Sequence, residues 1–388
     1  MSGSGRTLDT DLVILGGGCA GLSLAARLAT RCSSLKVMVI EARKHYIEDR
    51  TWCGWRTAPH PYVGCVAASW QKWRLIQGAR TIECASNLFP YEMVPSARFY
   101  AESLNLIRSS ASIRLDLGTT AESVMDEHEG VTTCLGDGRI LTARWAVDSR
   151  PRFRPLKFPS LWQNFVGYEV QADQRWTDRL GTTPMLMDFQ PAGASAIQFM
   201  YVLPLGEHRF LCEWTRFSST YGETDEIEAS LDSWMQQRGC ETNMIRRRES
   251  GSLPMAAPDH PAAGPSRIVM AGTVGGSMRA STGYAFHSIQ RWADSCADSL
   301  AAGGPPVSPA RNPTLDFLDE VFLTALQDRS TAGESIFTSM FERTDPDALV
   351  RFLGGVPRSW DVFSIMASLP RLHFSKAAAK TLTRKWAA

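Results

Sequence analysis

The sequence lacks several features that would point to common classes of protein. Its nine cysteines are scattered singly without a Cys-x-x-Cys pair, so we expect neither a disulfide framework nor a zinc site, and the pattern is typical of a reducing compartment. The net charge is only +1, so no basic field favours nucleic acid as a partner. No apolar run of about twenty residues occurs and residues 1–6 are a short polar lead-in, so we expect neither a transmembrane helix nor a signal peptide.

What is present describes a folded protein with a generous apolar content. With 388 residues, of which 44% are hydrophobic and 21% charged, the chain suits about two domains plus an appendage. Its twelve tryptophans and fourteen methionines indicate large apolar or π-rich surfaces beyond an average core.

A dinucleotide-binding pattern stands near the start of the chain. An apolar run over residues 11–15 leads into Gly16-Gly-Gly-Cys-Ala-Gly21, and a second apolar run ends in Glu41, twenty residues later. Gly16 permits a tight turn, Gly18 lets the backbone approach a pyrophosphate, and Gly21 lets helix and strand pack closely. The following helix N-terminus would bind the phosphates, and the acid a ribose hydroxyl. The alternative is a glycine-rich turn that binds no ligand, but the strand, the helix and the spaced acid together favour a nucleotide site. The predicted cofactor-binding residues are Gly16, Gly18, Ala20, Gly21 and Glu41.

A second glycine-rich turn, Val269-Met-Ala-Gly-Thr-Val-Gly-Gly276, follows a β-rich block far downstream. This order indicates one nucleotide domain assembled from separated segments, with a sheet inserted between them. NAD dehydrogenases usually keep this domain contiguous, whereas flavoproteins of the glutathione-reductase and hydroxylase types do not, so the order favours FAD over NAD. We therefore predict an α/β fold: a Rossmann-like FAD-binding domain of that type, an inserted β-sheet substrate domain and a C-terminal helical region.

The pattern of elements gives boundaries for these parts. Residues 97–108 have helical periodicity, residues 113–148 alternate like short strands with a turn at Gly136-Asp-Gly138, and residues 164–218 alternate like long strands. From residue 314 onward the chain is predicted to be helical. The predicted parts are a discontinuous FAD-binding domain at 1–60, 90–150 and 265–305, a substrate-binding sheet domain at 61–89 and 151–264 that begins in a Pro/Arg-rich crossing at 150–155, and a helical region at 306–388.

Several segments stand in a specific order and spacing. They are Asp11-Leu-Val-Ile-Leu-Gly-Gly-Gly18, Thr51-Trp52, Tyr91 through Ser96-Ala-Arg-Phe99, Phe165-Val-Gly-Tyr-Glu169, Met187-Asp188, Tyr201-Val-Leu-Pro-Leu205, Phe210-Leu-Cys-Glu-Trp-Thr215, Ser281-Thr-Gly-Tyr284, Phe337-Thr-Ser-Met-Phe-Glu-Arg343 and Val350-Arg-Phe-Leu353. Together they resemble the lycopene cyclases, in particular the bacterial lycopene β-cyclase branch. The sequence departs from that family at two places. Trp214 stands where many relatives have a second acid, and Arg279-Ala280 stands where the family often has a His-Pro pair. These departures do not change the assignment to the class, but they leave the exact substrate and the type of product ring open.

The resemblance implies a non-redox isomerase that closes a ring at the end of a linear polyene. Its substrate would be lycopene, whose ψ-ends would become β-ionone rings, via γ-carotene to β-carotene, by protonation, carbocation ring closure and deprotonation. Reduced FAD, with NAD(P)H as its reductant, would be an electrostatic partner of the cation. The resemblance also implies peripheral attachment at the cytoplasmic side of a membrane and association with other enzymes of carotenoid synthesis.

Glu213 is the predicted catalytic residue, either as the proton donor or as the base near the flavin. If residues 209–217 form a strand, Leu211, Glu213 and Thr215 share one face and the alternating residues share the other. In an apolar cavity this carboxyl would keep a proton near neutral pH, because burial raises the pKa of an acid. The residues alone favour the alternative, a solvent-facing strand glutamate, whereas the resemblance favours the catalytic role.

Further candidates come from the same segments. Glu169 and Asp188 sit in or beside alternating strands and could relay a proton or simply close a salt bridge. Aromatic candidates for lining a polyene tunnel and facing the cation, unless they are plain core, are Trp52, Phe165, Tyr168, Trp214 and Tyr284. The remaining predicted cofactor contacts are Arg98, Asp148, Arg150, Gly272 and Gly283.

The C-terminal third is the candidate for membrane contact. Residues 349–374 are rich in apolar side chains, and residues 371–388 carry five basic residues and no acid. An apolar helical face is predicted from Leu315, Leu318, Val321, Phe322 and Leu326. The alternative is a packed helical cap with a basic tail.

Two other classes of function share parts of this pattern. A FAD-dependent monooxygenase or halogenase acting on an apolar substrate would share the nucleotide domain and the inserted sheet, but it would consume NAD(P)H and oxygen. A carotenoid- or flavin-binding protein without turnover would not need Glu213. The segments 210–213 and 337–343 favour the cyclase, because we do not expect them in a hydroxylase.

Overall fold

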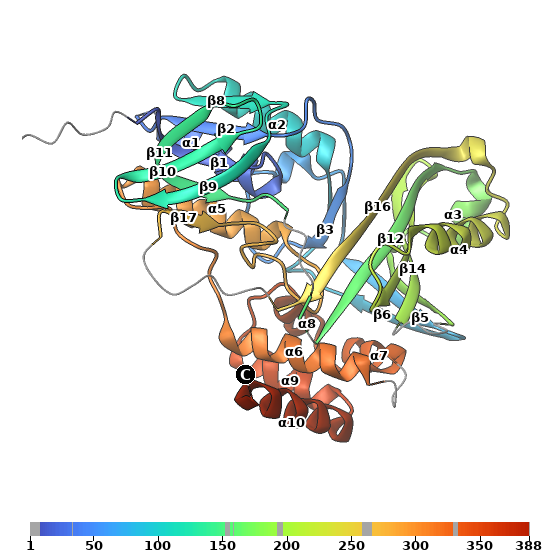
Figure 1. The fold of residues 1–388 in the computed structure, drawn as a ribbon. Helices are drawn as coiled ribbons and strands as arrows, with labels where there is room; N and C mark the ends of the chain where they lie inside the picture. The colour runs from blue at the N-terminus through green and yellow to red at the C-terminus, as the bar shows by residue number, and fades with distance from the viewer. Residues whose placement is uncertain are drawn as a thin grey trace, which may run out of the picture.

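The computed structural model describes residues 8–32, 34–151, 156–157, 159–191, 197–257, 266–328 and 333–387. Two seven-stranded sheets and a group of C-terminal helices form its three parts, and a small three-stranded sheet lies between them (Figure 1). Across these described ranges no helix combines the length and hydropathy needed to cross a bilayer, and no group of His, Cys, Asp and Glu side chains is arranged to hold a metal ion.

The first sheet is parallel at its centre and has the order β8-β2-β1-β11-β10-β9, with β17 also beside β11. Residues 12–15 of β1 are fully buried because helices cover one face of this central strand and further strands and loops cover the other. Helices α1, α2 and α5 pack together on one side (Figure 1). The elements are β1 (Thr10–Leu15), α1 (Cys19–Arg31), β2 (Val37–Glu41), α2 (Ser96–Arg108), β8 (Ile113–Leu117), β9 (Ala121–Glu127), β10 (Gly130–Leu135), β11 (Ile140–Asp148), β17 (Ile268–Met270) and α5 (Phe286–Ala301).

The second sheet has the order β16-β12-β15-β14-β13-β5-β6 and is antiparallel except between β13 and β5. Helices α3 and α4 cover one face, where alternate strand residues join them in an apolar cluster. The other face looks toward the rest of the molecule (Figure 1). The elements are β5 (Lys72–Gln77), β6 (Arg80–Ala85), β12 (Ser160–Gln171), α3 (Gln174–Leu180), β13 (Met185–Gln190), β14 (Ile197–Gly206), β15 (Arg209–Ser218), α4 (Thr224–Gln236) and β16 (Ile245–Ala256).

A small antiparallel sheet, β3-β7-β4, connects the parts. The C-terminal helices pack beneath the second sheet, with α6 against β12 and β16 and α7 against β5 and β6 (Figure 1). The remaining elements are β3 (Thr51–Trp55), β4 (Ala68–Trp70), β7 (Tyr91–Pro95), α6 (Pro313–Gln327), α7 (Gly333–Arg343), α8 (Pro346–Leu353), α9 (Ser359–Ser368) and α10 (Arg371–Ala387), with short 3-10 turns at Val63–Cys65 and Thr242–Met244.

The predicted fold class is confirmed, with local corrections. The predicted helix over 97–108 appears as α2, and the predicted turn at 136–138 closes the hairpin between β10 and β11. Helices α3 and α4 were not predicted in the strand-rich block. Of the predicted crossing at 150–155, only residues 150 and 151 lie within the described ranges.

The apolar face predicted over residues 314–326 is present on α6, and of the two alternatives for it the structure supports the packed helical cap. The apolar face of α6 does not face outward, because Leu315, Val321 and Leu326 are each at most 6% exposed and belong to apolar clusters of the interior. Leu318 and Phe322 also pack against the main cluster. This face therefore holds the C-terminal helices to the second sheet.

A buried ion pair ties the C-terminal helices to the loop before α5. Asp319 of α6 is 5% exposed and accepts hydrogen bonds from Ser281 at 2.7 Å and from the Arg279 side chain, whose Nε lies 3.3 Å away. The same guanidinium also donates to the carbonyl of Phe352 in α8. One carboxylate thus links three segments that are distant in sequence.

We expect Asp319→Ala to destabilise the protein by about 3 kcal/mol or more in urea unfolding, because it leaves the buried Arg279 charge without its partner. The matched control is Asp316→Ala on the same helix, whose ion pair with Arg311 is more exposed and should contribute about 1 kcal/mol at most. Equal losses in the two variants would contradict this assignment.

Candidate active site

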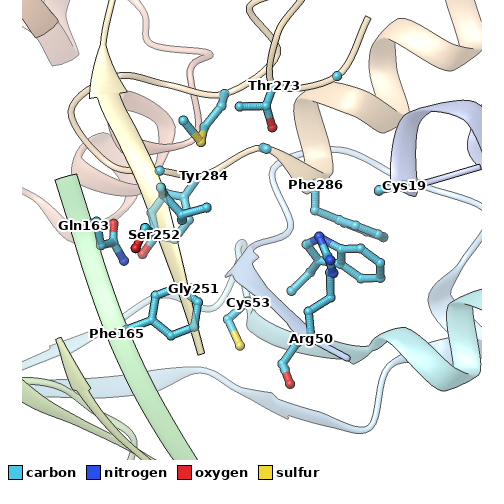
Figure 2. A pocket seen from close by; sticks show the side chains of 18 of the residues that line it. Cys19, Arg50, Cys53, Gln163, Phe165, Gly251, Ser252, Thr273, Tyr284 and Phe286 are labelled. Atoms are coloured by element: carbon cyan, nitrogen blue, oxygen red, sulfur yellow. The ribbon is translucent and has the colours of Figure 1, made fainter. Parts of the chain in front are cut away.

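A cavity of about 780 Å³ lies where the three parts meet. One end is formed by the loops after β1 and β2 and by the turn after β17, and the other by strands of the second sheet with helices α7 and α8. Figure 2 shows Arg50 and Phe286 at the first end, and Phe165 and Tyr284 at the second. The cavity therefore has a charged end beside the first sheet and an apolar end beside the second.

The glycine loop after β1 shapes the charged end. Gly16 has φ +97°, a conformation that side chains disfavour, and a Cβ at Gly21 would lie 1.9 Å from the Gly16 carbonyl oxygen. A Cβ at Gly18 would meet nothing within 4 Å, and no side chain caps the first turn of α1. The predicted residues Gly16, Gly18 and Ala20 line the cavity, while Gly21 supports the turn from behind.

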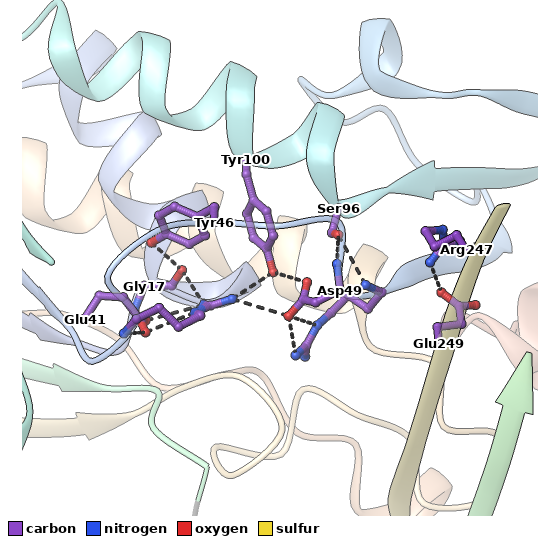
Figure 3. Close-up of polar contacts among 10 residues, drawn as sticks. Gly17, Glu41, Tyr46, Asp49, Ser96, Tyr100, Arg247 and Glu249 are labelled. Atoms are coloured by element: carbon purple, nitrogen blue, oxygen red, sulfur yellow. Dashed lines mark hydrogen bonds and ion pairs between the residues drawn. The ribbon is translucent and has the colours of Figure 1, made fainter. Parts of the chain in front are cut away.

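Glu41 lies at the end of β2 and lines the same space. Its carboxylate accepts hydrogen bonds from the Gly17 amide at 2.6 Å and from the Arg43 amide and Nε at 2.8 and 3.0 Å (Figure 3). Burial alone would raise the pKa of Glu41, but these hydrogen bonds outweigh burial and lower it. The carboxylate is ionised, and a carboxylate has lone pairs left to accept a hydroxyl.

Three arginines line the charged end: Arg43, Arg50 and Arg150. Arg50 pairs with Asp49 at 2.8 Å, and Arg150 pairs with Asp148 at 2.8 Å. Only Arg150 was predicted from the sequence. Arg43 and Arg50 were missed, although Arg43 stands two residues after the predicted acid.

Two predicted cofactor contacts need correction. Arg98 is exposed on α2, outside the cavity lining, because its guanidinium donates to the Val66 carbonyl at 3.1 Å. Asp148 is fully buried at the end of β11 and also lies outside the lining. Its carboxylate binds the backbone and guanidinium of Arg150, so it positions that arginine.

The turn after β17 completes this end. Gly272, at φ +66°, and Gly283, at φ +71°, which the sequence predicts as cofactor contacts, both line the cavity. A Cβ at Gly283 would lie 2.9 Å from the Gln163 amide oxygen, so this turn approaches β12 closely. Helix α5 then begins at Phe286, and the N-terminus of this helix lies at the cavity wall. No side chain caps its first turn, so its first backbone N–H groups have no side-chain acceptor.

Aromatic side chains dominate the apolar end. The predicted residues Phe165 and Tyr284 line it. The predicted Trp52 also lines the cavity, but beside Phe286 of the first end, with 5.7 Å between the ring centroids. A Cβ at Gly251 would lie 2.7 Å from the Phe165 ring, so the absence of a side chain there makes room for that ring. Apolar and aromatic lining residues that the sequence did not single out are Trp55, Tyr91, Phe199, Tyr201, Phe217 and Phe337.

Glu213 faces this apolar end from β15. The predicted alternation is confirmed: Leu211, Glu213 and Thr215 line the cavity, while the residues between them pack against α3 and α4. The Thr215 hydroxyl donates to Glu213 at 2.7 Å. Burial, and secondarily the neighbouring Glu249 carboxylate, raise the pKa of Glu213 to about 8. The carboxyl therefore carries a proton at neutral pH, as a general acid requires.

Three predicted cavity residues lie on the wrong face of the second sheet. Tyr168 and Trp214 belong to the cluster beneath α3 and α4, where the Tyr168 hydroxyl donates to Glu228 and Asp232, each at 2.9 Å. Asp188 pairs across the sheet with a residue of the same cluster, and Arg238 and Arg74 are its charged neighbours. Strand alternation excludes all three from the cavity wall.

Glu169 points to the cavity side of β12 but does not line the cavity. Its carboxylate accepts a hydrogen bond from Nε of Arg247 at 3.4 Å. The same arginine donates to Glu249, which the sequence did not single out and which does line the cavity. Glu249 was missed because it follows Arg246, Arg247 and Arg248, a run typical of a solvated strand. Arg247 forms ion pairs with Glu48, Glu169 and Glu249, and of these three the structure places Glu249, which was not predicted, beside Glu213.

The chain is similar in sequence to proteins of one family. The family model described as "Lycopene cyclase protein" matches residues 11–379. The lycopene beta-cyclase of Pseudescherichia vulneris is 26% identical over 309 residues, which cover 76% of each chain. The lycopene beta-cyclase of a Paracoccus species is 31% identical over 216 residues, which cover 53% of this chain and 51% of that protein.

Solved structures share the fold at lower sequence identity. A geranylgeranyl bacteriochlorophyll reductase-like protein from Thermoplasma acidophilum has a TM-score of 0.57 at 14% identity, covering 95% of this chain and 98% of that one. A flavoprotein/dehydrogenase from Cytophaga hutchinsonii has a TM-score of 0.55 at 14% identity, covering 97% and 99%. The p-nitrophenol 4-monooxygenase of Pseudomonas putida has a TM-score of 0.56 at 14% identity, covering 96% and 97%.

The raised pKa of Glu213 predicts that the stability difference between the wild-type protein and Glu213→Gln depends on pH. Between pH 4.5 and about 8 the folded protein retains a proton that the unfolded chain releases, so stability falls as pH rises through this window. We expect Glu213→Gln to remove this penalty, which is roughly 3 kcal/mol at pH 7. Urea unfolding of both proteins at pH 5, 7 and 9 should show a gain that grows with pH; a pH-independent difference would contradict the buried, protonated state.

Proposed function

The chain belongs to the lycopene cyclase family, and we propose that it is a lycopene β-cyclase that converts the linear ψ-ends of lycopene into β-ionone rings without net redox change. The observation that carries this proposal is the carboxyl of Glu213, whose pKa burial raises, on the wall of a cavity lined by aromatic side chains. Protonation of an alkene needs a neutral acid in an apolar site, and this placement supports that role.

In this proposal the Glu213 carboxyl gives its proton to the terminal double bond of the polyene. The resulting tertiary carbocation accepts electrons from the next double bond, so that one carbon–carbon bond forms and closes the ring. Loss of a proton from the ring carbon next to the new cation centre then restores a double bond. The Glu213 carboxylate, now ionised, can accept that proton, so atoms and charge balance over one cycle.

The aromatic wall supports the same chemistry. Rings such as those of Phe165 and Tyr284 present π-faces, which stabilise a cation without forming a bond to it. They also keep water out, and water would otherwise trap the cation as an alcohol. The cavity volume of about 780 Å³ lies in the range of sites that bind cofactors and other small molecules.

The charged end fits FAD in our proposal. The free N-terminus of α1 and the guanidinium groups of Arg43, Arg50 and Arg150 would hold the pyrophosphate, and Glu41 would accept a ribose hydroxyl. The open space at Gly18 leaves room for the phosphates. When bound and reduced by NAD(P)H, FAD would supply negative charge near the cation and would not be consumed.

Lycopene is insoluble in water, so we also propose that the protein takes it from a membrane surface. Trp360, Phe363 and Met366 recur every third residue on α9 and are 72%, 59% and 56% exposed. Helix α10 adds the exposed Leu372 and carries basic residues without an acid. Exposed aromatic and basic side chains together suit an anionic bilayer, beside the helices that close the apolar end.

The cyclase activity is tested with purified protein, lycopene in liposomes and chemically reduced FAD under anaerobic conditions. We expect cyclised product without net flavin oxidation, and at least a hundredfold lower rate in Glu213→Gln, because the amide cannot donate the proton. Asp188→Asn, which alters a carboxyl on the other face of the same sheet, should keep most of the activity. Absence of product, with NAD(P)H and oxygen consumed once air is admitted, would identify a monooxygenase instead.

The membrane surface is tested by co-sedimentation with vesicles containing anionic lipid. The double variant Trp360→Ser/Phe363→Ser should bind at least tenfold more weakly, because it removes apolar area that would enter the bilayer. Ile140→Ser is the control, since Ile140 is 62% exposed on β11, in the first sheet. Unchanged binding of the double variant would exclude α9 from the membrane surface.

A further inference from the structure

Two carboxylates of the cavity wall meet across a glycine. Strand β12 lies between β15 and β16, and Gly167 of β12 is in register with Glu213 on one side and with Glu249 on the other. A Cβ at Gly167 would lie 3.3 Å from the Glu213 Cβ and 3.5 Å from the Glu249 Cγ. Both side chains therefore lean over the glycine, and any larger residue there would separate them.

The two carboxyl groups have different partners. Glu249 is 6% exposed and accepts hydrogen bonds from Arg247 at 2.6 Å and from the Thr51 hydroxyl at 2.8 Å (Figure 3 shows the first). Thr51 in turn accepts from Arg247 at 2.9 Å. Glu213 accepts from the neutral Thr215 hydroxyl. A cation thus stabilises the charge of Glu249 directly, whereas Glu213 lies beside a negative group.

We propose that Glu249 is the second acidic residue of the active site: held by Arg247 and Thr51, its negative charge adds to the effect of burial in opposing ionisation of Glu213, and it faces the positive charge of the cyclising substrate. This inference rests on the proposed cyclase function for its substrate-facing part. The pairing itself rests on the strand register and on the contacts of Glu249.

The strand geometry also explains why the acid lies on a different strand from Glu213. An acid at position 214, directly after Glu213, would point into the cluster beneath α3 and α4, as Trp214 does. It could not reach the cavity. Position 249 on the strand beyond β12 does reach it, because the row Glu213–Gly167–Glu249 crosses the sheet on a single face.

The other groups around Glu213 do not titrate near neutral pH. Cys53 of β3 and Tyr201 of β14 share the cavity wall, and burial raises the pKa of each far above neutral. Tyr91 and Tyr284 behave in the same way. Arg247 is the nearby cation, and it stands behind Glu249. Glu249 is therefore the charged neighbour that raises the pKa of Glu213 further, in addition to burial.

The first test is the pH dependence of cyclisation by the FAD-loaded, reduced enzyme. Activity requires protonated Glu213, so the wild-type rate should fall above about pH 8. In Glu249→Gln we expect this fall in rate, the alkaline limb of the pH–rate profile, to occur about one pH unit lower. The rate on the plateau of the profile, below the alkaline limb, should fall at least tenfold. Glu169→Gln, which removes another carboxylate bound to Arg247, should leave the limb in place. An unmoved limb in Glu249→Gln overturns the inference.

A second test does not require turnover. The pH-dependent stability gain of Glu213→Gln is measured by urea unfolding, once in the wild-type background and once in Glu249→Gln. If the carboxylates are coupled, the gain at pH 7 shrinks and its midpoint moves to lower pH in the second background. Identical gains in both backgrounds overturn the pairing even if the wild type proves to be no cyclase.

If Glu249→Gln does not fold, the double variant Arg247→Gln/Glu249→Gln replaces it in both tests. The double variant removes the arginine together with its carboxylate partner, so Arg247 is not left as an unpaired buried charge. The alkaline limb and the stability gain should move in the same directions as for Glu249→Gln, since Glu249 is the nearer charge. A double variant that folds with both values unchanged overturns the inference.

Discussion

The alternation of side chains along β12, β15 and β16 is the constraint on which the site depends. These neighbouring strands present one set of residues to α3 and α4 and the other set to the cavity. On β12 and β15 the residues that line the cavity stand at every second position, and a shift of one residue would exchange the two faces. The register of three strands therefore decides that Glu213 meets an aromatic wall and not the helices.

Much of the charge around the cavity is already paired within the protein. Glu41 is held by Gly17 and Arg43, Arg150 by Asp148, and Glu249 by Arg247 and Thr51. Such fixed pairs keep their orientation while a ligand enters, so the field at the cavity changes little. Glu213 differs, because burial raises its pKa and the neighbouring Glu249 carboxylate raises it further. Both causes favour the protonated form of this carboxyl.

The parts of the site that the sequence predicts are the local ones. Gly16, Gly18 and Glu41 belong to one β-α-β unit whose spacing fixes their geometry, and the alternation around Glu213 follows from a single strand. Glu249 and Arg50 were not predicted as site residues, because their positions depend on which strands and loops become neighbours. A single sequence does not show pairing between residues more than thirty positions apart. Tyr168 failed for a related reason: both faces of β12 are buried, so an aromatic residue fits either one.

The fold is shared with a geranylgeranyl bacteriochlorophyll reductase-like protein and with a p-nitrophenol 4-monooxygenase, so the fold alone does not select the reaction. In our proposal the selection lies in the second sheet. A monooxygenase needs oxygen beside its flavin, whereas proton-driven ring closure needs a neutral acid, an apolar wall and no water. The row Glu213–Gly167–Glu249 supplies the acid, and the aromatic rings supply the wall. In this proposal Gly167 also matters to the reaction, because the absence of a side chain there leaves space for Glu213 and Glu249 to lie on either side of it.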